Sequence, residues 1–165
     1  MIEDVEKFRE MLDAYPVCKE CIRLQQDWEN EESFKLLIHE RKNSPSEVYG
    51  TTLTFLYCMD TEDVQYTTLM EAFSGVNRED LMYRDDIFKL DAMPDEIEIF
   101  RGTQDYNESV PRFSWSLKEK VARHYGIAHM FRAVVKKEQV LAYYSKNGDE
   151  EEIIIRLETG YERIY

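Results

Sequence analysis

The sequence predicts an α+β protein in which helices come first and a β-sheet follows. Apolar residues recur at helical spacing through the first half of the chain and change to alternation or short runs after Met93-Pro94. The composition, 43% hydrophobic and 13% aromatic residues, supplies a core that disordered chains of similar charge lack. The 165 residues suffice for one globular domain, with or without an added subdomain.

Five or six short helices are expected before residue 94, on the basis of apolar spacing and helix-breaking junctions. Ser46 is a candidate N-cap for a helix that runs through Tyr57, because it follows the breaker Asn43-Ser44-Pro45. Similar junctions occur at 60–63 and 77–80. The apolar stripes comprise Ile2, Val5, Phe8, Met11 and Leu12; Val17, Cys21, Leu24 and Trp28; Phe34, Leu37 and Ile38; and Val48, Leu53, Leu56 and Tyr57.

Extended segments are expected after Pro94, because β-branched and aromatic residues gather there in short runs. A short helix over 118–125 interrupts them. The predicted strands are 97–101, 110–117, 130–135, 140–144 and 152–157. The sequence therefore predicts a helical region at 1–94, part of or packed on the core, and a β-rich core at 95–165.

The charge of the chain is uneven. Lys and Arg number 21 against 34 Asp and Glu, a net charge of −13, which argues against general binding to nucleic acid or an anionic membrane surface. Residues 101–137 reverse the balance with eight basic and three acidic side chains, or +5. An anionic small ligand is one explanation of this basic island, and chance is the other.

Several classes of protein are disfavoured. The chain has no apolar run long enough to span a membrane, and its first residues lack the pattern of a signal peptide. Cys18, Cys21 and Cys58 suit a reducing compartment, and the Cys18-x-x-Cys21 pair has no second pair to complete a zinc site. We therefore expect a cytoplasmic protein without a metal site.

Three motifs in the sheet half carry candidate chemistry. Arg101-Gly102 ends the first predicted strand, and glycine lets a ligand approach the backbone closely. Ser114-Trp115-Ser116 places two hydroxyls on one side of a strand and leads into a helix. Glu150-Glu151-Glu152 places carboxylates at alternating positions where an apolar strand begins.

In this order, the three motifs resemble the R-S-E signature of mono-ADP-ribosyltransferases of the arginine-modifying toxin type, and most closely its compact bacterial and phage-encoded members. The resemblance covers about residues 95–157. It implies a split β-sheet core and an enzyme that transfers ADP-ribose from NAD to a protein acceptor, with arginine favoured, and releases nicotinamide. It also allows a bacterial toxin or phage effector.

The resemblance assigns a role to each motif residue. Glu152 would stabilise the positive charge that develops on the ribose, and Glu150 would orient or deprotonate the acceptor. Arg101 would bind the NAD phosphate or ribose, and Gly102 would offer its backbone to the nicotinamide amide. Ser114 would hold Glu152 in place. Ser116 would take a secondary, structural role in the cofactor site.

Other assignments are less direct. Trp115 stands where better-known members carry a small polar residue, so Trp115, Phe113 or an N-terminal helix is expected to cover nicotinamide. Asp149 and Glu151 form a second alternating pair, and Glu152 is preferred because it directly precedes the apolar strand. Tyr143 and Tyr144 precede the segment that corresponds to the acceptor-recognition loop of the family. An aromatic residue there would contact the target protein.

Two other functions stay open at this point. One is an NAD glycohydrolase that uses the same site with water as the acceptor. The other is a catalytically inactive, acidic binding protein whose helical half mimics nucleic acid. Each motif also has a structural explanation: Arg101 as a surface strand residue, the serines at a strand edge, and the glutamates in a solvated turn.

Overall fold

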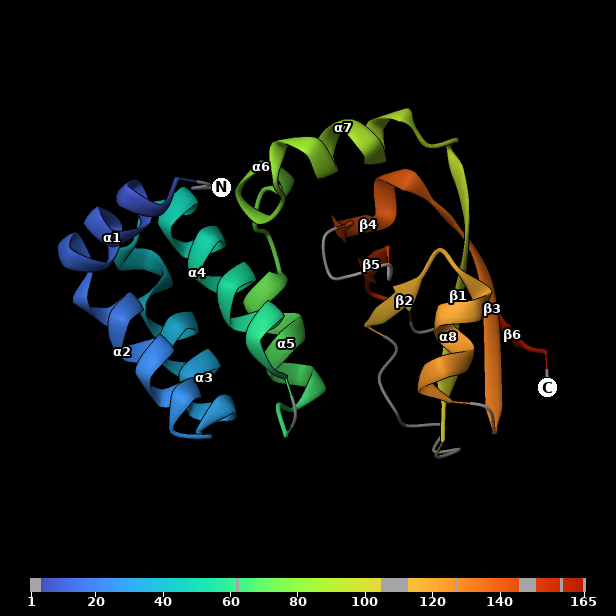
Figure 1. Cartoon of the computed structure of the whole chain (residues 1–165), viewed down its shortest axis with the longest axis horizontal. Helices are drawn as coiled ribbons and strands as arrows, with labels where there is room; N and C mark the ends of the chain where they lie inside the picture. The colour runs from blue at the N-terminus through green and yellow to red at the C-terminus, as the bar shows by residue number, and fades with distance from the viewer. Residues whose placement is uncertain are drawn as a thin grey trace. The chain divides into compact units, whose positions relative to one another are not determined.

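The computed structural model describes residues 4–61, 63–104, 113–126, 128–145, 151–157 and 159–164. The chain divides into two compact units, Met1–Arg84 and Asp85–Tyr165. We call them the helical unit and the sheet unit (Figure 1). This boundary lies ten residues before the boundary predicted at residue 94. The reason is that the last helix before the sheet, at 84–92, belongs almost entirely to the sheet unit.

The described residues before residue 94 form seven α-helices, one more than the five or six predicted, and six of them lie in the helical unit. The seventh precedes the sheet. Ser46 is the first residue of its helix and Pro45 is the N-cap, so the prediction that Ser46 caps this helix was wrong. Its hydroxyl donates to Asp80 instead. The helices are α1 (Val5–Ala14), α2 (Pro16–Gln26), α3 (Asn30–Glu40), α4 (Ser46–Met59), α5 (Tyr66–Phe73), α6 (Arg78–Leu81) and α7 (Arg84–Ala92).

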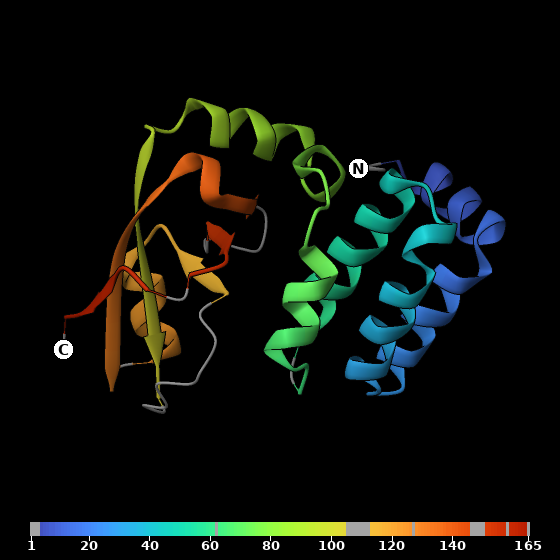
Figure 2. The same cartoon turned by 180° about the vertical axis from the view of Figure 1, so that it is seen from behind.

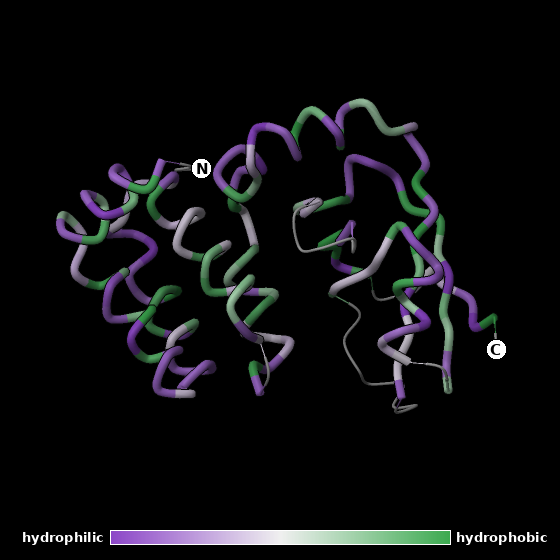
Figure 3. The backbone as a smooth tube through the Cα atoms, viewed as in Figure 1, coloured by the Kyte–Doolittle hydropathy of each residue, from purple (hydrophilic) through white to green (hydrophobic). Residues whose placement is uncertain are grey.

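Helix α4 is the core helix of its unit. Figure 3 shows mainly white and green along α4 and α5, and alternating purple and green along α1 to α3. Leu53 and Leu56 of α4 have no exposed surface, and Gly50 lies so close to α6 that a Cβ there would be 2.5 Å from the Asp80 carbonyl oxygen. The apolar stripes of α1 to α3 pack inward through Met11, Cys18, Cys21, Phe34 and Leu37, as in amphipathic helices. Trp28, predicted to continue the stripe of α2, lies beyond the end of that helix with a φ of +65° and is 81% exposed, and Val5 of α1 is also exposed.

The sheet unit holds one six-stranded sheet in the order β4-β5-β2-β1-β3-β6, and every neighbouring pair is antiparallel. Strand positions agree with the predicted ones to within a few residues, but β6 was not predicted. The elements are β1 (Glu96–Thr103), β2 (Ser114–Ser116), α8 (Glu119–Tyr125), β3 (His129–Lys136), β4 (Val140–Tyr144), β5 (Glu152–Ile155) and β6 (Tyr161–Arg163). The α+β class is therefore confirmed.

The sheet curves around its core. The rings of Trp115 on β2 and Tyr161 on β6 are 6.3 Å apart between centroids, although β1 and β3 lie between these strands in the sheet order. Helix α8 lies against the sheet beside β1, in front of it in Figure 1 and behind it in Figure 2. One face of the central strands thus lines the core, while α8 packs at the end of β1.

Candidate functional site

The three predicted motifs lie on adjacent strands. Arg101 is on β1, Ser114 on β2 and Glu152 on β5, and these strands are neighbours in the order β5-β2-β1. The register places Ser116 opposite both Phe100 and Glu152. Since directly opposed residues share a face and alternate residues point the same way, Ser114, Ser116 and Glu152 lie on one face of the sheet. Arg101 follows Phe100 and therefore starts on the other face, so it reaches the backbone of Ser114 and not its hydroxyl.

Hydrogen bonds connect these residues across the three strands. The Arg101 guanidinium donates through Nη1 to the backbone carbonyl of Ser114, and the Ser114 hydroxyl donates to Oε1 of Glu152. We call this series the Arg101–Ser114–Glu152 chain. Glu152 is 9% exposed, so its carboxylate is buried and hydrogen-bonded. A buried carboxylate with a hydroxyl donor has a fixed position, which is what an electrostatic role in catalysis requires.

Ser116 has a separate function in the fold. Its side chain is buried, and its Oγ accepts a hydrogen bond of 3.0 Å from the Lys118 N–H just before α8. The residue thus links the end of β2 to the start of the helix. This arrangement fits the structural role that the resemblance implied for Ser116.

Gly102 is explained by close packing. A Cβ at this position would lie 1.9 Å from the carbonyl oxygen of Ala122, in α8, so no other residue fits without displacing the helix. Gly126 mirrors it, because a Cβ there would lie 2.1 Å from the Thr103 backbone nitrogen. The predicted contact between Gly102 and nicotinamide is therefore not needed to account for the glycine.

The position of Trp115 does not favour its predicted role. Its side chain is 1% exposed, lies on the opposite face of β2 from Ser114 and Ser116, and contacts Tyr161 in the core. Phe113 is 4% exposed. An indole in the core cannot cover a ligand held by Ser114 and Glu152, so we do not retain Trp115 or Phe113 as a nicotinamide cover.

The acidic run divides by position. Glu150, predicted to orient the acceptor, lies outside the described residues, as does Asp149. Glu151 directs its carboxylate to Lys118 and Tyr143, with Oε2 3.1 Å from Lys118 Nζ and Oε1 accepting from the Tyr143 hydroxyl at 3.3 Å. Glu152 instead meets Ser114. Of the two registers that the sequence left open, this geometry favours the one that ends at Glu152.

Comparisons of the chain with protein-family models, with curated proteins and with solved structures find no match. The resemblance therefore rests on the motifs and on where the structure places them.

The two tyrosines before the predicted recognition loop are buried. Tyr143 is 1% exposed and Tyr144 is 2% exposed, so neither presents its ring to a target protein. Burial, with the nearby Glu151 carboxylate, raises the pKa of Tyr143 to about 12. The phenol is thus protonated at neutral pH and acts as a hydrogen-bond donor to Glu151.

The basic island does not form one positive surface. Its cations pair with nearby carboxylates: Lys118 with Glu151, Arg123 with Glu119, Arg132 with Glu98 and Glu162, Lys136 with Glu138, and Lys137 with Asp95. These pairs neutralise much of the +5 locally. Among the described island residues, Arg101 reaches the Ser114 backbone and Lys118 reaches Glu151, so both lie beside the candidate site.

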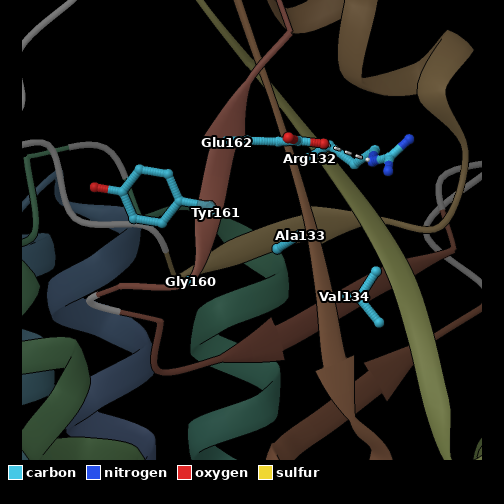
Figure 4. A pocket seen from close by; sticks show the side chains of 6 residues that line it. All are labelled: Arg132, Ala133, Val134, Gly160, Tyr161 and Glu162. Atoms are coloured by element: carbon cyan, nitrogen blue, oxygen red, sulfur yellow. Dashed lines mark ion pairs between the residues drawn. The ribbon is translucent and has the colours of Figure 1, made fainter.

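An open pocket of about 350 Å³ lies on β3 and β6, strands that carry none of the three motifs (Figure 4). Arg132 and Glu162 form an ion pair of 3.1 Å at its rim, and the side chains of Tyr161 and Val134 line other parts of it. Most of its charge is thus already paired. We do not assign the candidate chemistry to this pocket.

Sequence reasoning missed Asp86. This carboxylate in the first turn of α7 has no exposed surface, and its Oδ1 accepts from both the backbone N–H and the hydroxyl of Ser145, which follows β4. Its Oδ2 has no hydrogen-bond partner among the described residues. An acidic residue near a helix start is common, so the sequence carried no signal for this contact.

Two general findings bear on the expected class of protein. No helix within the described ranges is both long and apolar enough to cross a membrane. In the same ranges, no three His, Cys, Asp or Glu side chains gather as a metal site would require. Cys18 and Cys21 are buried on α2.

Proposed function

We propose that this protein is an NAD-dependent mono-ADP-ribosyltransferase that modifies a protein acceptor, with arginine as the favoured residue. The observation that supports the proposal is the Arg101–Ser114–Glu152 chain. Three motifs separated in sequence supply an arginine, a serine and a buried carboxylate to neighbouring strands, in the order that the resemblance implies.

The proposed reaction exchanges one bond at C1′ of the nicotinamide ribose. The C1′–N bond to nicotinamide breaks with its electron pair, and a nitrogen of the acceptor guanidine forms a new C1′–N bond and loses a proton. Positive charge develops on the ribose as the first bond breaks. A fixed, desolvated carboxylate stabilises such charge more than a mobile one in water does, and Glu152 is of this kind.

The other two residues serve binding and positioning in this proposal. Ser114 donates to Glu152, which fixes the carboxylate oxygen that faces β2. Arg101 would bind the NAD diphosphate or ribose, since a guanidinium presents several donors in a planar fork that matches phosphate oxygens. The Arg101 guanidinium bonds the backbone carbonyl of Ser114, the residue whose hydroxyl holds Glu152.

A second candidate function, an acidic binding protein without catalysis, is favoured by the charge of the helical unit. Residues 1–84 carry 9 Lys and Arg against 18 Asp and Glu, a net charge of 9 minus 18, or −9. Such a surface attracts a basic partner, and the attraction weakens as salt is added. This function makes no use of Glu152.

The deciding experiment measures nicotinamide release from labelled NAD by the purified protein, with a cell lysate as the source of acceptors. Glu152→Gln keeps the shape of the side chain and removes its charge, so we expect release to fall about 100-fold or more. Glu162→Gln is the matched control, because Glu162 is an exposed residue of the same sheet, and its activity should equal that of the wild type.

Each outcome points to one function. Release that requires Glu152 and labels a lysate protein supports the transferase. Release that requires Glu152 and labels no protein supports the glycohydrolase, with water in place of the acceptor. Wild-type protein that releases no nicotinamide overturns both enzymes, and salt-sensitive capture of a basic protein by the wild type and by Glu152→Gln alike then supports the binding protein.

A further inference from the structure

Glu151, the residue before β5, has an unusual backbone conformation. Its φ is +45°, in the left-handed region that residues other than glycine rarely adopt. Its carbonyl oxygen accepts a hydrogen bond of 3.1 Å from the Leu117 N–H, which follows β2. Such a conformation persists when surrounding contacts determine it, and it then often marks a place where geometry matters for function.

The side chain of Glu151 supplies those contacts. One carboxylate oxygen lies 3.1 Å from Lys118 Nζ, and the other accepts from the hydroxyl of Tyr143 at 3.3 Å. Lys118 precedes α8, and Tyr143 is a buried residue of β4. Glu151 is therefore held through its backbone and both carboxylate oxygens, by groups from two segments of the sheet unit: the link between β2 and α8, and strand β4.

The consequence falls on the next residue. Glu152 begins β5 directly after the left-handed residue, and its carboxylate meets Ser114 on the other side of the strand. If Glu151 turned into ordinary extended backbone, the start of β5 would rotate and carry the Glu152 carboxylate away from Ser114. The contacts of Glu151 thus set the orientation of Glu152.

We propose that Glu151 is a positioning residue of the active site, held by Lys118 and Tyr143, which orients the Glu152 carboxylate for cleavage of the nicotinamide–ribose bond. This inference rests on the proposed function. It gives Glu151 a role that the motif alone does not. The Glu151 carboxylate is paired with Lys118 and Tyr143, so it does not act on the acceptor.

The test compares kcat and KM for NAD in nicotinamide release. Lys118→Met and Tyr143→Phe each remove one contact of Glu151 and leave Arg101, Ser114 and Glu152 in place. We expect each variant to lower kcat about 10-fold, since small displacements of a catalytic group have effects of this order, with KM changed by less than about twofold. Lys118→Arg restores a cation at the same position and should recover most of the lost kcat.

Lys120→Met is the matched control, because Lys120 is an exposed lysine at the start of the same helix and forms no ion pair with the described residues. Its kcat should equal that of the wild type. Thermal unfolding of each variant separates positioning from stability, since a purely structural contact lowers the unfolding temperature and leaves the kcat of the remaining folded protein unchanged.

The possible failures are distinct. Wild-type protein that releases no nicotinamide overturns the proposed function and this inference with it. Active wild-type protein whose kcat is unaffected by Lys118→Met and Tyr143→Phe, in the same assay in which Glu152→Gln abolishes release, overturns only the positioning role. Failure of Lys118→Arg to recover kcat also counts against that role.

Discussion

The helical unit and the sheet unit differ in how they bury polar side chains. In the helical unit, the buried hydroxyl of Thr68 donates to the partly exposed carboxylate of Glu31. Other buried hydroxyls there donate to backbone carbonyls: Ser33 to Cys21, Tyr49 to Ala72, and Thr54 to Leu81. These are neutral groups that satisfy neighbouring helices. In the sheet unit, the buried polar groups include two carboxylates, Asp86 and Glu152, and each accepts from a serine hydroxyl.

This difference separates packing from function. A neutral hydroxyl bonded to a carbonyl costs little to bury, whereas a carboxylate loses strong hydration and costs several kcal/mol unless its partners compensate. Packing alone gives no reason to bury a charge. Among the described residues, the buried carboxylates are confined to the sheet unit, so that unit is where a chemical function is expected.

The largest predicted effect concerns alkaline pH, where the helical unit should lose stability first. Burial, with the nearby Cys18, raises the pKa of Cys21 from 9.0 to about 12, and burial raises the pKa of Tyr49 to about 12. Below pH 9 the Cys21 thiol is protonated in both folded and unfolded chains, so its full contribution to stability is present. Above pH 9 the unfolded thiol ionises first, and that contribution, roughly 4 kcal/mol, is lost as the pH approaches 12.

Far-ultraviolet circular dichroism during an alkaline titration measures this effect. Helical signal should fall as the pH rises above 9, and Cys21→Ala should flatten the dependence while Cys58→Ser, at an exposed thiol, leaves it unchanged. In the sheet unit, the pKa of Tyr143 is raised in the same way, to about 12. A titration in which strand signal is lost before helical signal would contradict the comparison.

A smaller effect is predicted for glycines that both units need for close packing. Gly102→Ala would place a methyl group 1.9 Å from the Ala122 carbonyl oxygen, and Gly50→Ala would place one 2.5 Å from the Asp80 carbonyl oxygen. We expect each to destabilise its own unit by about 3 kcal/mol or more, the upper range for overpacking. Amide hydrogen exchange localises the loss; equal loss of protection in both units from either variant would contradict this prediction.

Much of the fold was predictable because its signals are local. The change from helical spacing to alternation at Pro94 identified the α+β class, and β4 was predicted at 140–144 with the bounds that the structure shows. The start of α4 was misjudged because Ser46 bonds to Asp80, a residue far along the chain. Strand β6 was missed because its three residues pair only with β3 and carry little pattern of their own.

The candidate site was predictable only as far as its signals are local in the sequence. The motifs placed Arg101, Ser114 and Glu152 on strands, but only the sheet order shows that those strands are adjacent. Trp115 was misjudged because alternation assigns a side chain to a face without saying which face lines the core. The role of Asp86 depends on a contact 59 residues away in the chain, which no local pattern carries.

A third prediction places the same substitution in both units. Ser114→Ala removes the hydroxyl that donates to Glu152, and Ser33→Ala removes one that donates to the Cys21 carbonyl. Hydrogen bonds to charged groups contribute about 1.5–3 kcal/mol, so Ser114→Ala should lower kcat for nicotinamide release about 10- to 100-fold. Ser33→Ala should cost only about 1 kcal/mol of stability. If both variants lost activity, the contrast between buried carboxylates in the sheet unit and neutral hydroxyls in the helical unit would not mark the catalytic site.

The smallest predicted effect asks whether every buried carboxylate in the sheet unit serves chemistry. Asp86 has one oxygen bonded to Ser145 and one without a partner, and no lysine or arginine of the described residues pairs with it. Asp86→Asn keeps the accepting oxygen and removes the charge. Since relief of an unpaired buried charge offsets small losses in geometry, we expect stability to change by about 1 kcal/mol or less.

Nicotinamide release by Asp86→Asn then decides what this carboxylate does. Unchanged release, together with a loss of about 1–3 kcal/mol of stability in Asp86→Ala, would show that Asp86 joins α7 to the end of β4 and that an amide serves there equally well. A lower kcat in Asp86→Asn at unchanged stability would show instead that the charge itself is needed. In that case both buried carboxylates of the sheet unit would belong to the catalytic site, and the contrast with the helical unit would be sharper than proposed.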